Sequence, residues 1–536
     1  MSASHNVARF LDQQASAQPE APALHIPRRD RQGVLSYTTY SFADLNDLVA
    51  RQGAALQRQG ITRGTRTLLL VKPGRDLIVT VFALFKIGAI PLVIDPGMGL
   101  RSFLRCVRHA RPEAVVAIPP GILLSRLFWG SFRSVRHRFT VRANGVDRLP
   151  PASLEAVPCT AGTPAAVLFT SGSTGPAKGV LYTHGIFDAQ VRLIRETYRI
   201  EPGEMDLPML PVFALFNPAL GMATVVPEIN PSRPATVHPP KILEALQRNA
   251  ITNTFGSPVL WHKITTYLEA TGQTLPGKRR ILMAGAPVPP SLHERLARAM
   301  PGVQTHTPYG ATEALPVCSM DGASILRETA ALSREGRGTC VGAPVPGVTV
   351  RIIALVDGPI PEWSGVTLLP PGEIGEVVVS GPIVTPAYDN LPEATAKAKI
   401  RDGAALWHRM GDVGYFDEAG RLWFCGRAVE RVVTPTTTLY PDCVEGLFRD
   451  LPDLHRTALI GLGRPGQQTP ALVVEPVVWP RSAAAREALL QTVRQHAAEH
   501  PLSQPISRFF LHRALPVDVR HNAKIHRLSL ARFYNR

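Results

Sequence analysis

The chain has 536 residues, of which 45% are apolar and 19% charged, and this composition excludes a disordered chain and favours several packed domains. Its 58 Lys and Arg residues exceed its 42 Asp and Glu residues, which leaves a net charge of +16 at pH 7. Nucleic acid, anionic membranes and phosphorylated ligands all attract such a surplus, so the charge alone does not choose among them.

The cysteines and the N-terminal sequence bear on the compartment. Six cysteines are dispersed along the chain without a Cys-x-x-Cys pair, which favours reduced thiols. The N-terminal stretch lacks a basic region followed by an apolar run, and no apolar stretch reaches the roughly 18 residues of a membrane-spanning helix. We therefore expect a cytoplasmic protein, and peripheral association with a membrane stays open.

The first hundred residues alternate between two kinds of apolar pattern. Apolar residues recur at helical spacing over residues 41–60, which predicts an amphipathic helix. An apolar strand is expected at 67–72, a helix at 76–89 and a strand at 90–95. This alternation predicts an α/β fold with mainly parallel sheets.

Residues 101–140 are rich in arginine and in large apolar side chains. One interpretation is a basic amphipathic surface that docks on anionic lipid or on a partner protein. The alternative is a solvated helix face around a buried strand, AVVAI. The arginines of this segment are Arg101, Arg105, Arg108, Arg111, Arg126, Arg133, Arg136 and Arg138.

The segment AAVLFTSGSTGPAKGV, residues 165–180, is the strongest motif of the chain. An apolar strand runs into a loop in which glycines let backbone N–H groups approach an anion, while hydroxyls donate hydrogen bonds and a lysine supplies a point charge. The loop is not GxxxxGK[ST], because Gly179 follows the lysine. We predict phosphate binding by Thr170, Ser171, Gly172, Ser173, Thr174, Gly175 and Lys178.

The final quarter of the chain has a pattern of its own. The sequence DEAG, between apolar runs, predicts a hairpin near residue 418. Strands are then expected at 457–463 and 471–476, and a helix at 485–500. We predict a large multi-layer N-terminal domain over 1–427, a hinge near Arg427 and Ala428, and a small α/β C-terminal domain over 428–536.

At these motifs the chain resembles the superfamily of adenylate-forming enzymes, which includes acyl-CoA synthetases and the adenylation domains of peptide synthetases. The resemblance covers nearly the whole chain and implies ATP and Mg²⁺ as cofactors and a small mobile C-terminal domain. It implies that Lys524, Glu313 and Thr174 are catalytic, that Glu313 holds Mg²⁺, and that Asp412 accepts hydrogen bonds from the ribose. The other implied ATP-binding residues are Gly285, Ala286, Pro287, Tyr309, Gly310, Ala311, Thr312 and Arg427.

Two segments depart from the pattern of CoA ligases in this superfamily. Residues 426–441, GRAVERVVTPTTTLYP, replace a glycine-containing loop by proline and β-branched threonines, which hinders close approach of a thin pantetheine arm. Residues 207–227 match the wall of an acyl pocket and contain Phe213, Ala214 and Phe216. No acidic residue stands there to anchor an amino group, so a fatty acid is favoured over an amino acid.

These features resemble the β-lactone synthetases of bacterial long-chain olefin biosynthesis, a branch of the same superfamily. The resemblance implies that ATP activates a long-chain 2-alkyl-3-hydroxy fatty acid, whose β-hydroxyl then closes a β-lactone and releases AMP. His184 is a candidate to orient that hydroxyl, and a purely structural histidine is the alternative.

Two other functions stay open. The first is a long-chain fatty acyl-CoA or acyl-AMP ligase, and the second is a membrane-binding scaffold. The olefin pathway also implies assembly with other enzymes of olefin biosynthesis. A nucleic-acid partner is disfavoured, because no nucleic-acid-binding motif with interleaved aromatic residues is present.

Overall fold

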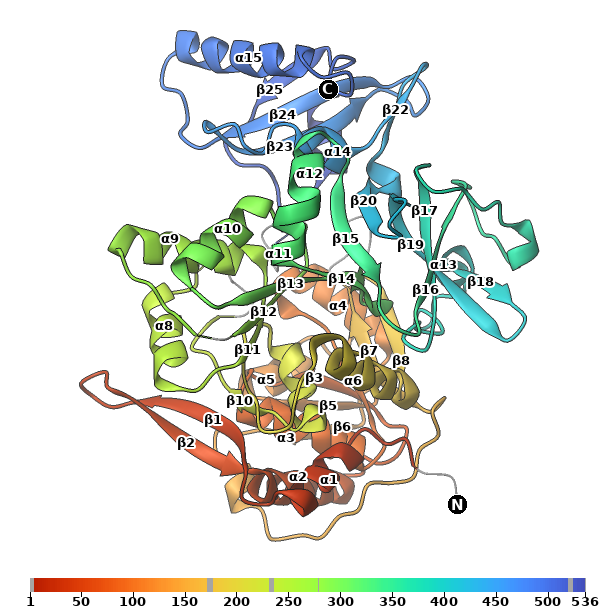
Figure 1. Cartoon of the computed structure of the whole chain (residues 1–536). Helices are drawn as coiled ribbons and strands as arrows, with labels where there is room; N and C mark the ends of the chain where they lie inside the picture. Colours follow the sequence, from red (N-terminus) through yellow and green to blue (C-terminus); the bar gives the residue numbers. More distant parts are fainter. Residues whose placement is uncertain (1–3, 171–176, 231–235, 278, 519–523, 536) are drawn as a thin grey trace.

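The computed structural model describes residues 4–170, 177–230, 236–277, 279–518 and 524–535 (Figure 1). It has the predicted α/β architecture, with a large N-terminal part built on two sheets and a smaller part formed by the end of the chain. Among the described residues, no helix is both long enough and apolar enough to cross a membrane.

A six-stranded sheet with the order β6-β5-β3-β4-β7-β8 forms the lower part of Figure 1. All its neighbouring strands are parallel except β7 and β8, which form a hairpin around the predicted phosphate loop. Its strands are β3 (Arg66–Leu70), β4 (Ile90–Val93), β5 (Ala114–Ala117), β6 (His137–Thr140), β7 (Pro164–Phe169) and β8 (Gly179–Thr183).

Helices α2 (Phe42–Arg58), α3 (Arg75–Lys86), α4 (Leu100–Ala110) and α5 (Pro119–Leu127) belong to the same lower part. The helices predicted at 41–60 and 76–89 are confirmed as α2 and α3. A capping box starts α2, because the Ser41 hydroxyl accepts from the Asp44 N–H at 3.1 Å and the Asp44 carboxylate accepts from the Ser41 N–H at 2.9 Å.

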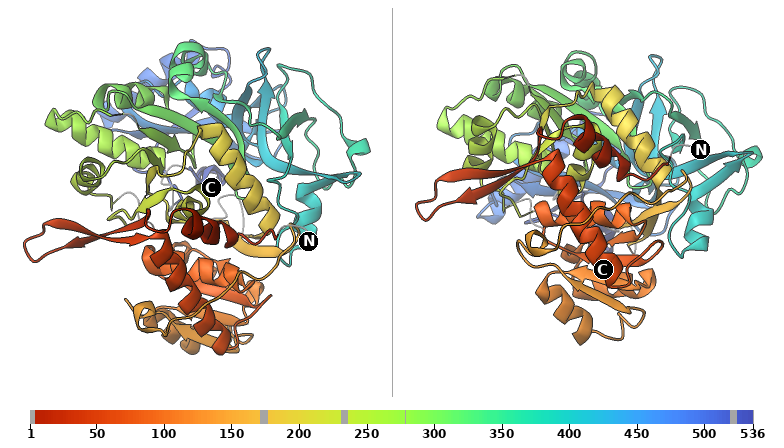
Figure 2. Two further views of the ribbon diagram at one scale, coloured as in Figure 1. Left: turned by 60° about the horizontal axis from the view of Figure 1, so that its bottom comes forward. Right: turned by 90° about the horizontal axis from the view of Figure 1, so that it is seen from below.

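A second sheet of fourteen strands runs through the middle of the molecule in the order β16-β17-β19-β20-β15-β14-β13-β12-β11-β9-β10-β1-β2, with β18 paired to β19. Strands β9 to β13 are parallel neighbours, whereas the pairs formed among β13 to β20 are antiparallel. Short hairpins connect β13 to β14, β18 to β19 and β19 to β20. The hairpin of β1 and β2 extends away from the body (Figure 2).

The strands of this sheet are β1 (Pro22–Arg29), β2 (Leu35–Ser41), β9 (Met205–Pro208), β10 (Ala223–Val225), β11 (Asn253–Gly256), β12 (Arg280–Met283), β13 (Gln304–Ala311), β14 (Ala314–Asp321), β15 (Thr339–Pro344), β16 (Thr349–Ile353), β17 (Gly375–Ser380), β18 (Lys399–Asp402), β19 (Ala405–Phe416) and β20 (Leu422–Arg427). The predicted hairpin near residue 418 is confirmed as the connection between β19 and β20.

The other helices before residue 428 are α1 (Arg9–Ala17), which lies beside α2 at the bottom of Figure 1, and α6 (His184–Tyr198), α7 (Asn217–Leu220), α8 (Pro239–Arg248), α9 (Pro258–Thr271), α10 (Pro290–Ala299), α11 (Gly322–Ser324), α12 (Ala330–Arg334) and α13 (Pro392–Ala398). Buried side chains of α8, α9 and α10 form one hydrophobic core with strands β9 and β12. Helix α6 follows directly on β8 and therefore connects the two sheets.

The end of the chain forms a three-stranded sheet with the order β23-β24-β25, at the top of Figure 1. The strands predicted at 457–463 and 471–476 are confirmed, as is the helix predicted at 485–500. The elements of this part are β21 (Val432–Val433), β22 (Thr438–Leu439), α14 (Pro441–Gly446), β23 (Leu454–Leu462), β24 (Thr469–Pro476), α15 (Ala483–Ala498), β25 (Arg508–Leu511) and α16 (Arg527–Tyr534).

Candidate active site

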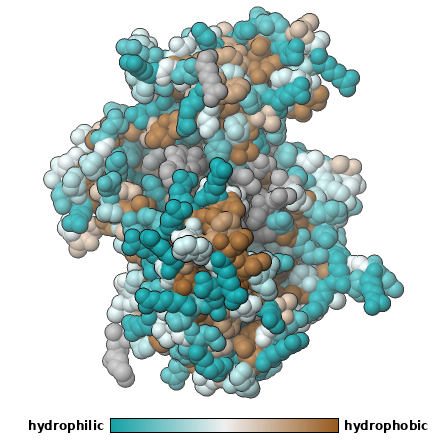
Figure 3. Space-filling model, turned by 180° about the vertical axis from the view of Figure 1, so that it is seen from behind, coloured by the Kyte–Doolittle hydropathy of each residue, from teal (hydrophilic) through white to brown (hydrophobic). Residues whose placement is uncertain are grey.

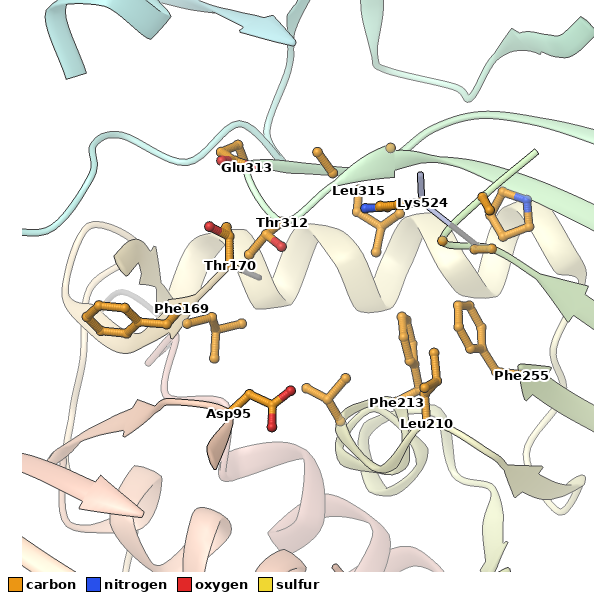
Figure 4. Close-up of a pocket in the computed structure, with 18 of the residues that line it drawn as sticks. Asp95, Phe169, Thr170, Leu210, Phe213, Phe255, Thr312, Glu313, Leu315 and Lys524 are labelled. Atoms are coloured by element: carbon orange, nitrogen blue, oxygen red, sulfur yellow. The ribbon is translucent and has the colours of Figure 1, made fainter. Parts of the chain in front are cut away.

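A cavity of about 1180 Å³ lies where the two large sheets and the C-terminal part meet (Figure 4). Its walls come from segments far apart in the sequence, including the ends of β4, β7, β12, β13 and β19 and the residues before α16. The carboxyl ends of parallel strands share one edge of a sheet, which is where α/β folds place their ligands. This cavity is the candidate active site.

The predicted phosphate loop starts at the cavity. Thr170 and Lys178 both line it, and they close the base of the loop, because the Thr170 N–H donates to the Lys178 carbonyl at 3.0 Å. The Lys178 ammonium lies 4.7 Å from the centre of the Tyr388 ring. The predicted residues Ser171, Gly172, Ser173, Thr174 and Gly175 lie outside the described residues.

The residues predicted to form the adenine and α-phosphate wall come together. Strand β12 ends just before Gly285, and β13 ends at Ala311 at the start of a tight hairpin to β14. Gly285 has φ of 96°, a backbone conformation that a side chain would disfavour. The seven predicted wall residues that line the cavity are Gly285, Ala286, Pro287, Tyr309, Gly310, Ala311 and Thr312.

Asp412, Arg427 and Tyr309 form a polar group in the cavity wall. Asp412 on β19 pairs with Arg427 on β20 in the strand register. The Tyr309 hydroxyl donates to Asp412 Oδ2 at 2.7 Å, and the Arg427 guanidinium donates to Asp412 Oδ1. Burial and the Asp412 carboxylate raise the pKa of Tyr309 well above its usual value, so the phenol keeps its proton and stays a donor.

In this arrangement the Asp412 carboxylate can accept further hydrogen bonds. An ionised carboxylate accepts about four hydrogen bonds, and the two protein donors use two of them. The carboxylate next to Arg427 also raises the pKa of that guanidinium, so the pair is a fixed ion pair. Two acceptor positions therefore stay available for a vicinal diol such as a ribose.

Glu313 lies in the turn between β13 and β14, and it contacts the segment around residue 388. Its Oε1 atom accepts from the Tyr388 hydroxyl at 2.7 Å, and its carbonyl accepts from both the N–H and the hydroxyl of Thr385 at 3.0 Å. The Lys399 ammonium lies 3.5 Å from the Thr385 hydroxyl, and burial lowers the pKa of Lys399 to about 7. Glu313 is thus held by its neighbours with one carboxylate oxygen toward the cavity.

This donor set fits Mg²⁺. Mg²⁺ in phosphoryl-transfer sites takes one or two protein carboxylates and completes its shell with phosphate oxygens and water. Among the described residues no cluster of three or more His, Cys, Asp or Glu side chains could hold a metal ion by itself. A single carboxylate is therefore adequate only together with the phosphates of a nucleotide, which the neighbouring Thr170 and Lys178 are placed to bind.

Lys524 reaches the cavity from the C-terminal part (Figure 4). Its backbone N–H donates to Asp518 Oδ1 at 2.9 Å, and its carbonyl accepts from the Asp518 N–H at 3.0 Å. Three residues later, Arg527 donates to both Glu445 oxygens, at 2.7 and 2.6 Å, and to Glu430 at 2.9 Å. These contacts hold the segment that carries Lys524 beside Glu430 and Glu445, close to the predicted hinge.

The predicted acyl-pocket residues divide into two groups. Phe213 and Phe216 line the cavity, and Phe213 stacks on Phe255 with ring centres 3.5 Å apart. Ala214 is absent from the described lining residues, because it packs into the core of the lower sheet. An apolar wall has a buried side as well as a cavity side, and Ala214 belongs to the former.

His184 is absent from the described lining residues too. Its Nδ1 atom accepts a hydrogen bond from the Val7 N–H at 3.2 Å, and its ring packs edge-on against Phe85. Burial, with smaller contributions from neighbouring cations, lowers the pKa of His184 to about 4, so the ring is neutral at pH 7. The geometry therefore favours the structural alternative for this histidine and gives no support to its orienting a substrate hydroxyl.

Among the polar residues that line the cavity and were not predicted from the sequence are Asp95 and Tyr388. Asp95 follows β4, and its side chain points into the cavity, although Oδ1 also accepts from the Gly97 N–H at 2.8 Å (Figure 4). Tyr388 covers Lys178 and bonds Glu313. Asp95 had a readable signal, because it ends a predicted parallel strand, whereas Tyr388 had none.

The fold and the cavity define an enzyme that binds a nucleotide next to an apolar substrate. Residues 11–389 match the family of AMP-binding enzymes, and the chain belongs to this family. The described lining residues also agree with the resemblance to adenylate-forming enzymes, since thirteen predicted positions meet at one site, namely Thr170, Lys178, Gly285, Ala286, Pro287, Tyr309, Gly310, Ala311, Thr312, Glu313, Asp412, Arg427 and Lys524.

Two relatives are similar over almost their entire length. The olefin β-lactone synthetase of Xanthomonas campestris pv. campestris is 43% identical, and the match covers 98% of this chain and 97% of the relative. The olefin β-lactone synthetase of Stenotrophomonas maltophilia is 41% identical with the same coverage. Among solved structures, the amide bond synthetase McbA from Marinactinospora thermotolerans has the same fold, with a TM-score of 0.79, 22% identity and 99% coverage of each chain.

Proposed function

We propose that this chain is an ATP-dependent β-lactone synthetase of long-chain olefin biosynthesis. It adenylates the carboxylate of a long-chain 2-alkyl-3-hydroxy fatty acid, and the β-hydroxyl then closes the β-lactone and releases AMP. The observation that carries the proposal is the 43% identity with an olefin β-lactone synthetase over 98% of the chain. The cavity supports it, because it joins a nucleotide site to an apolar pocket.

In the first half-reaction, the substrate carboxylate attacks the α-phosphorus of ATP and pyrophosphate leaves. Asp412 and Arg427 fix the ribose, and Thr170 with Lys178 bind phosphate oxygens. Lys524 donates to the oxygens on which negative charge grows in the transition state. Mg²⁺ bound at Glu313 supplies further charge neutralisation on the phosphates.

In the second half-reaction, the oxygen of the β-hydroxyl attacks the acyl carbon of the adenylate. The hydroxyl gives its proton to the departing phosphate or to solvent, the bond between the acyl carbon and the phosphate oxygen breaks, and AMP leaves as the four-membered ring closes. The nucleophile is part of the substrate, so no second substrate has to enter. Phe213, Phe216 and Phe255 make an apolar wall that keeps water from hydrolysing the adenylate.

The segment after the hinge supports this assignment over CoA ligation. Strands β21 and β22 form a short hairpin whose turn is closed by Thr434, because its hydroxyl accepts from the N–H groups of Thr436 and Thr437 at 3.2 and 2.9 Å. Threonine side chains thus fill a turn in which CoA ligases of the superfamily have flexible glycines. A pantetheine arm has less room to lie against this backbone.

One assay separates the two activities. The purified chain is incubated with ATP, Mg²⁺ and a synthetic 2-alkyl-3-hydroxy acid, with and without CoA, and the products are identified by NMR. We expect AMP and the β-lactone without CoA. A product that forms only when CoA is present would refute the proposal and establish a long-chain acyl-CoA ligase.

We further propose that the C-terminal part, residues 428–536, rotates as a mobile domain about the hinge at Arg427 and Ala428. The chain would work together with the enzymes of olefin biosynthesis that supply the hydroxy acid and consume the lactone. Co-purification of the tagged chain with these enzymes from a producing cell tests the assembly.

A further inference from the structure

Helix α5 and the turn after it expose three large apolar side chains. Leu123, Leu127 and Trp129 are 66%, 70% and 74% exposed. Leu123 and Leu127 are four residues apart and therefore lie on the same face of the helix. Single exposed apolar residues are ordinary on a protein surface, but a cluster of this kind marks an interaction site.

Other residues of α5 belong to the cavity wall. Gly121 and Leu124 line the cavity, together with Ile118 just before the helix and with Leu100 and Phe103 of α4. One helix therefore carries both the exposed apolar cluster and part of the lining of the cavity. Helix α5 therefore lies between the apolar lining of the cavity and the surface of the protein.

The segment that contains this cluster is rich in arginine and poor in carboxylates. Residues 101–140 hold eight arginines and one carboxylate, Glu113, so the segment contributes +7 of the net charge of +16. Seven of these arginines are exposed, and none of the seven forms an ion pair with a carboxylate in the part of the chain that the structure describes. They are Arg101, Arg105, Arg108, Arg111, Arg126, Arg133 and Arg136.

The exposed side chains and the arginines together define the α4–α5 face, residues 100–136. On the side opposite to that of Figure 1, apolar side chains gather in the middle of the molecule with hydrophilic ones around them (Figure 3). Aromatic and leucine side chains bordered by cations of one sign suit the boundary between lipid headgroups and acyl chains. Each basic side chain near an anionic leaflet adds to the attraction.

We propose that the α4–α5 face binds the surface of an anionic membrane. Leu123, Leu127 and Trp129 insert into the headgroup region, and the arginines contact lipid phosphates. Membrane binding by this face does not depend on the proposed reaction, because it rests on the exposed apolar side chains and on the charge of the arginines. It also places the wall of the apolar cavity against the phase in which long acyl chains dissolve.

Protein–lipid co-sedimentation tests the surface directly. Wild type is sedimented with vesicles of phosphatidylcholine and with vesicles of phosphatidylcholine mixed with phosphatidylglycerol. We expect binding to the anionic vesicles, weakened by salt, and little binding to the neutral ones. Absence of binding to anionic vesicles would overturn the proposal.

Two triple variants assign the binding to the α4–α5 face. In Arg126→Gln/Arg133→Gln/Arg136→Gln each lost cation lowers the partition coefficient about fivefold, so binding weakens roughly 100-fold. The variant Leu123→Gln/Leu127→Gln/Trp129→Gln removes the inserting side chains and is expected to bind weakly as well.

The matched control is a third triple variant in the C-terminal part, Arg464→Gln/Arg481→Gln/Arg486→Gln, which removes three exposed cations elsewhere. We expect the control to retain most of the binding. An equal loss in the control would show that net charge alone attracts the vesicles and would refute a specific face.

A fluorescence measurement keeps the test valid if a triple variant does not fold. Trp129 is exposed, whereas Trp261, Trp407 and Trp423 are buried. Anionic vesicles that contain brominated lipid should quench part of the wild-type emission, and Trp129→Phe should lose that quenching. Quenching that persists in Trp129→Phe would refute insertion at this face. If the wild type self-associates but does not bind vesicles, and Leu127→Gln abolishes the self-association, the α4–α5 face is a contact between copies of the chain and the membrane proposal is refuted.

Discussion

Replacing Asp412 with asparagine removes one charge from the nucleotide site while keeping the shape of the side chain. In the structure Asp412 is buried, and its two oxygens accept from Tyr309 and Arg427. Asparagine has one accepting oxygen and an NH₂ group that only donates. In Asp412→Asn the Arg427 guanidinium loses its ionic partner, and a ribose loses its charged hydrogen-bond acceptor.

The expected loss follows from the number of hydrogen bonds. A hydrogen bond to a charged group contributes about 1.5–3 kcal/mol, so two bonds to ribose hydroxyls are worth about 3 kcal/mol or more. Since about 1.4 kcal/mol corresponds to a factor of ten, ATP binding should weaken roughly 100-fold or more. Tyr309→Phe keeps the carboxylate and removes only one donor to it, so its effect should be about tenfold or less.

Isothermal titration calorimetry with a non-hydrolysable ATP analogue measures both variants. Thermal unfolding without nucleotide checks the fold, because Asp412→Asn also leaves a buried cation without its partner. A folded Asp412→Asn variant that binds the analogue within about threefold of wild type, well under one step of 1.4 kcal/mol, would refute the assignment of Asp412 to the ribose.

Three further predictions concern other residues of the structure. Lys524→Ala should slow pyrophosphate release about 10²–10³-fold at an unchanged melting temperature, and an unchanged rate would exclude Lys524 from adenylation. Glu313→Gln should raise the Mg²⁺ concentration needed for half-maximal activity, measured by magnesium titration, and an unshifted curve would argue against metal binding there. Burial lowers the pKa of His293 to about 4, below the ordinary 6.5, so the unfolded chain binds the proton first and stability falls as pH drops from 6.5 toward 4. Urea unfolding of His293→Gln should therefore show about 2 kcal/mol less destabilisation than wild type at pH 5, and equal pH dependence would contradict this.

Local patterns predicted the elements well because they depend on neighbours in the sequence. The apolar period and the Ser41–Asp44 cap determine α2, and the DEAG turn determines the hairpin between β19 and β20. The glycines, hydroxyls and lysine of the predicted phosphate loop also lie within a few residues of one another, and this loop stays a prediction because residues 171–176 lie outside the described residues. Such motifs carry both their structure and their chemistry in one short segment.

Contacts between distant segments were not predictable in this way. Tyr388 donates a hydrogen bond to the carboxylate of Glu313, 75 residues earlier in the chain. Lys399 donates to the Thr385 hydroxyl, which in turn donates to the Glu313 carbonyl. No spacing rule connects these positions, because the register of the large sheet brings them together. The positions of Ala214 and His184 outside the described lining have a related cause, since an apolar composition does not say which side chains face the cavity and which face the core.

The position of Lys524 depends on contacts that join the C-terminal part to the rest of the chain. Thr339 on β15 donates to Asp442 on α14 at 2.6 Å, and Arg334 on α12 pairs with Asp450 at 2.7 Å. The second pair is exposed and is therefore worth at most about 1 kcal/mol. By contrast, the bonds of Arg527 to Glu430 and Glu445 lie on the C-terminal side of the predicted hinge. A rotation at Arg427 and Ala428 would break the first two contacts and keep the Arg527 bonds, so Lys524 could leave the cavity while its own support stays intact.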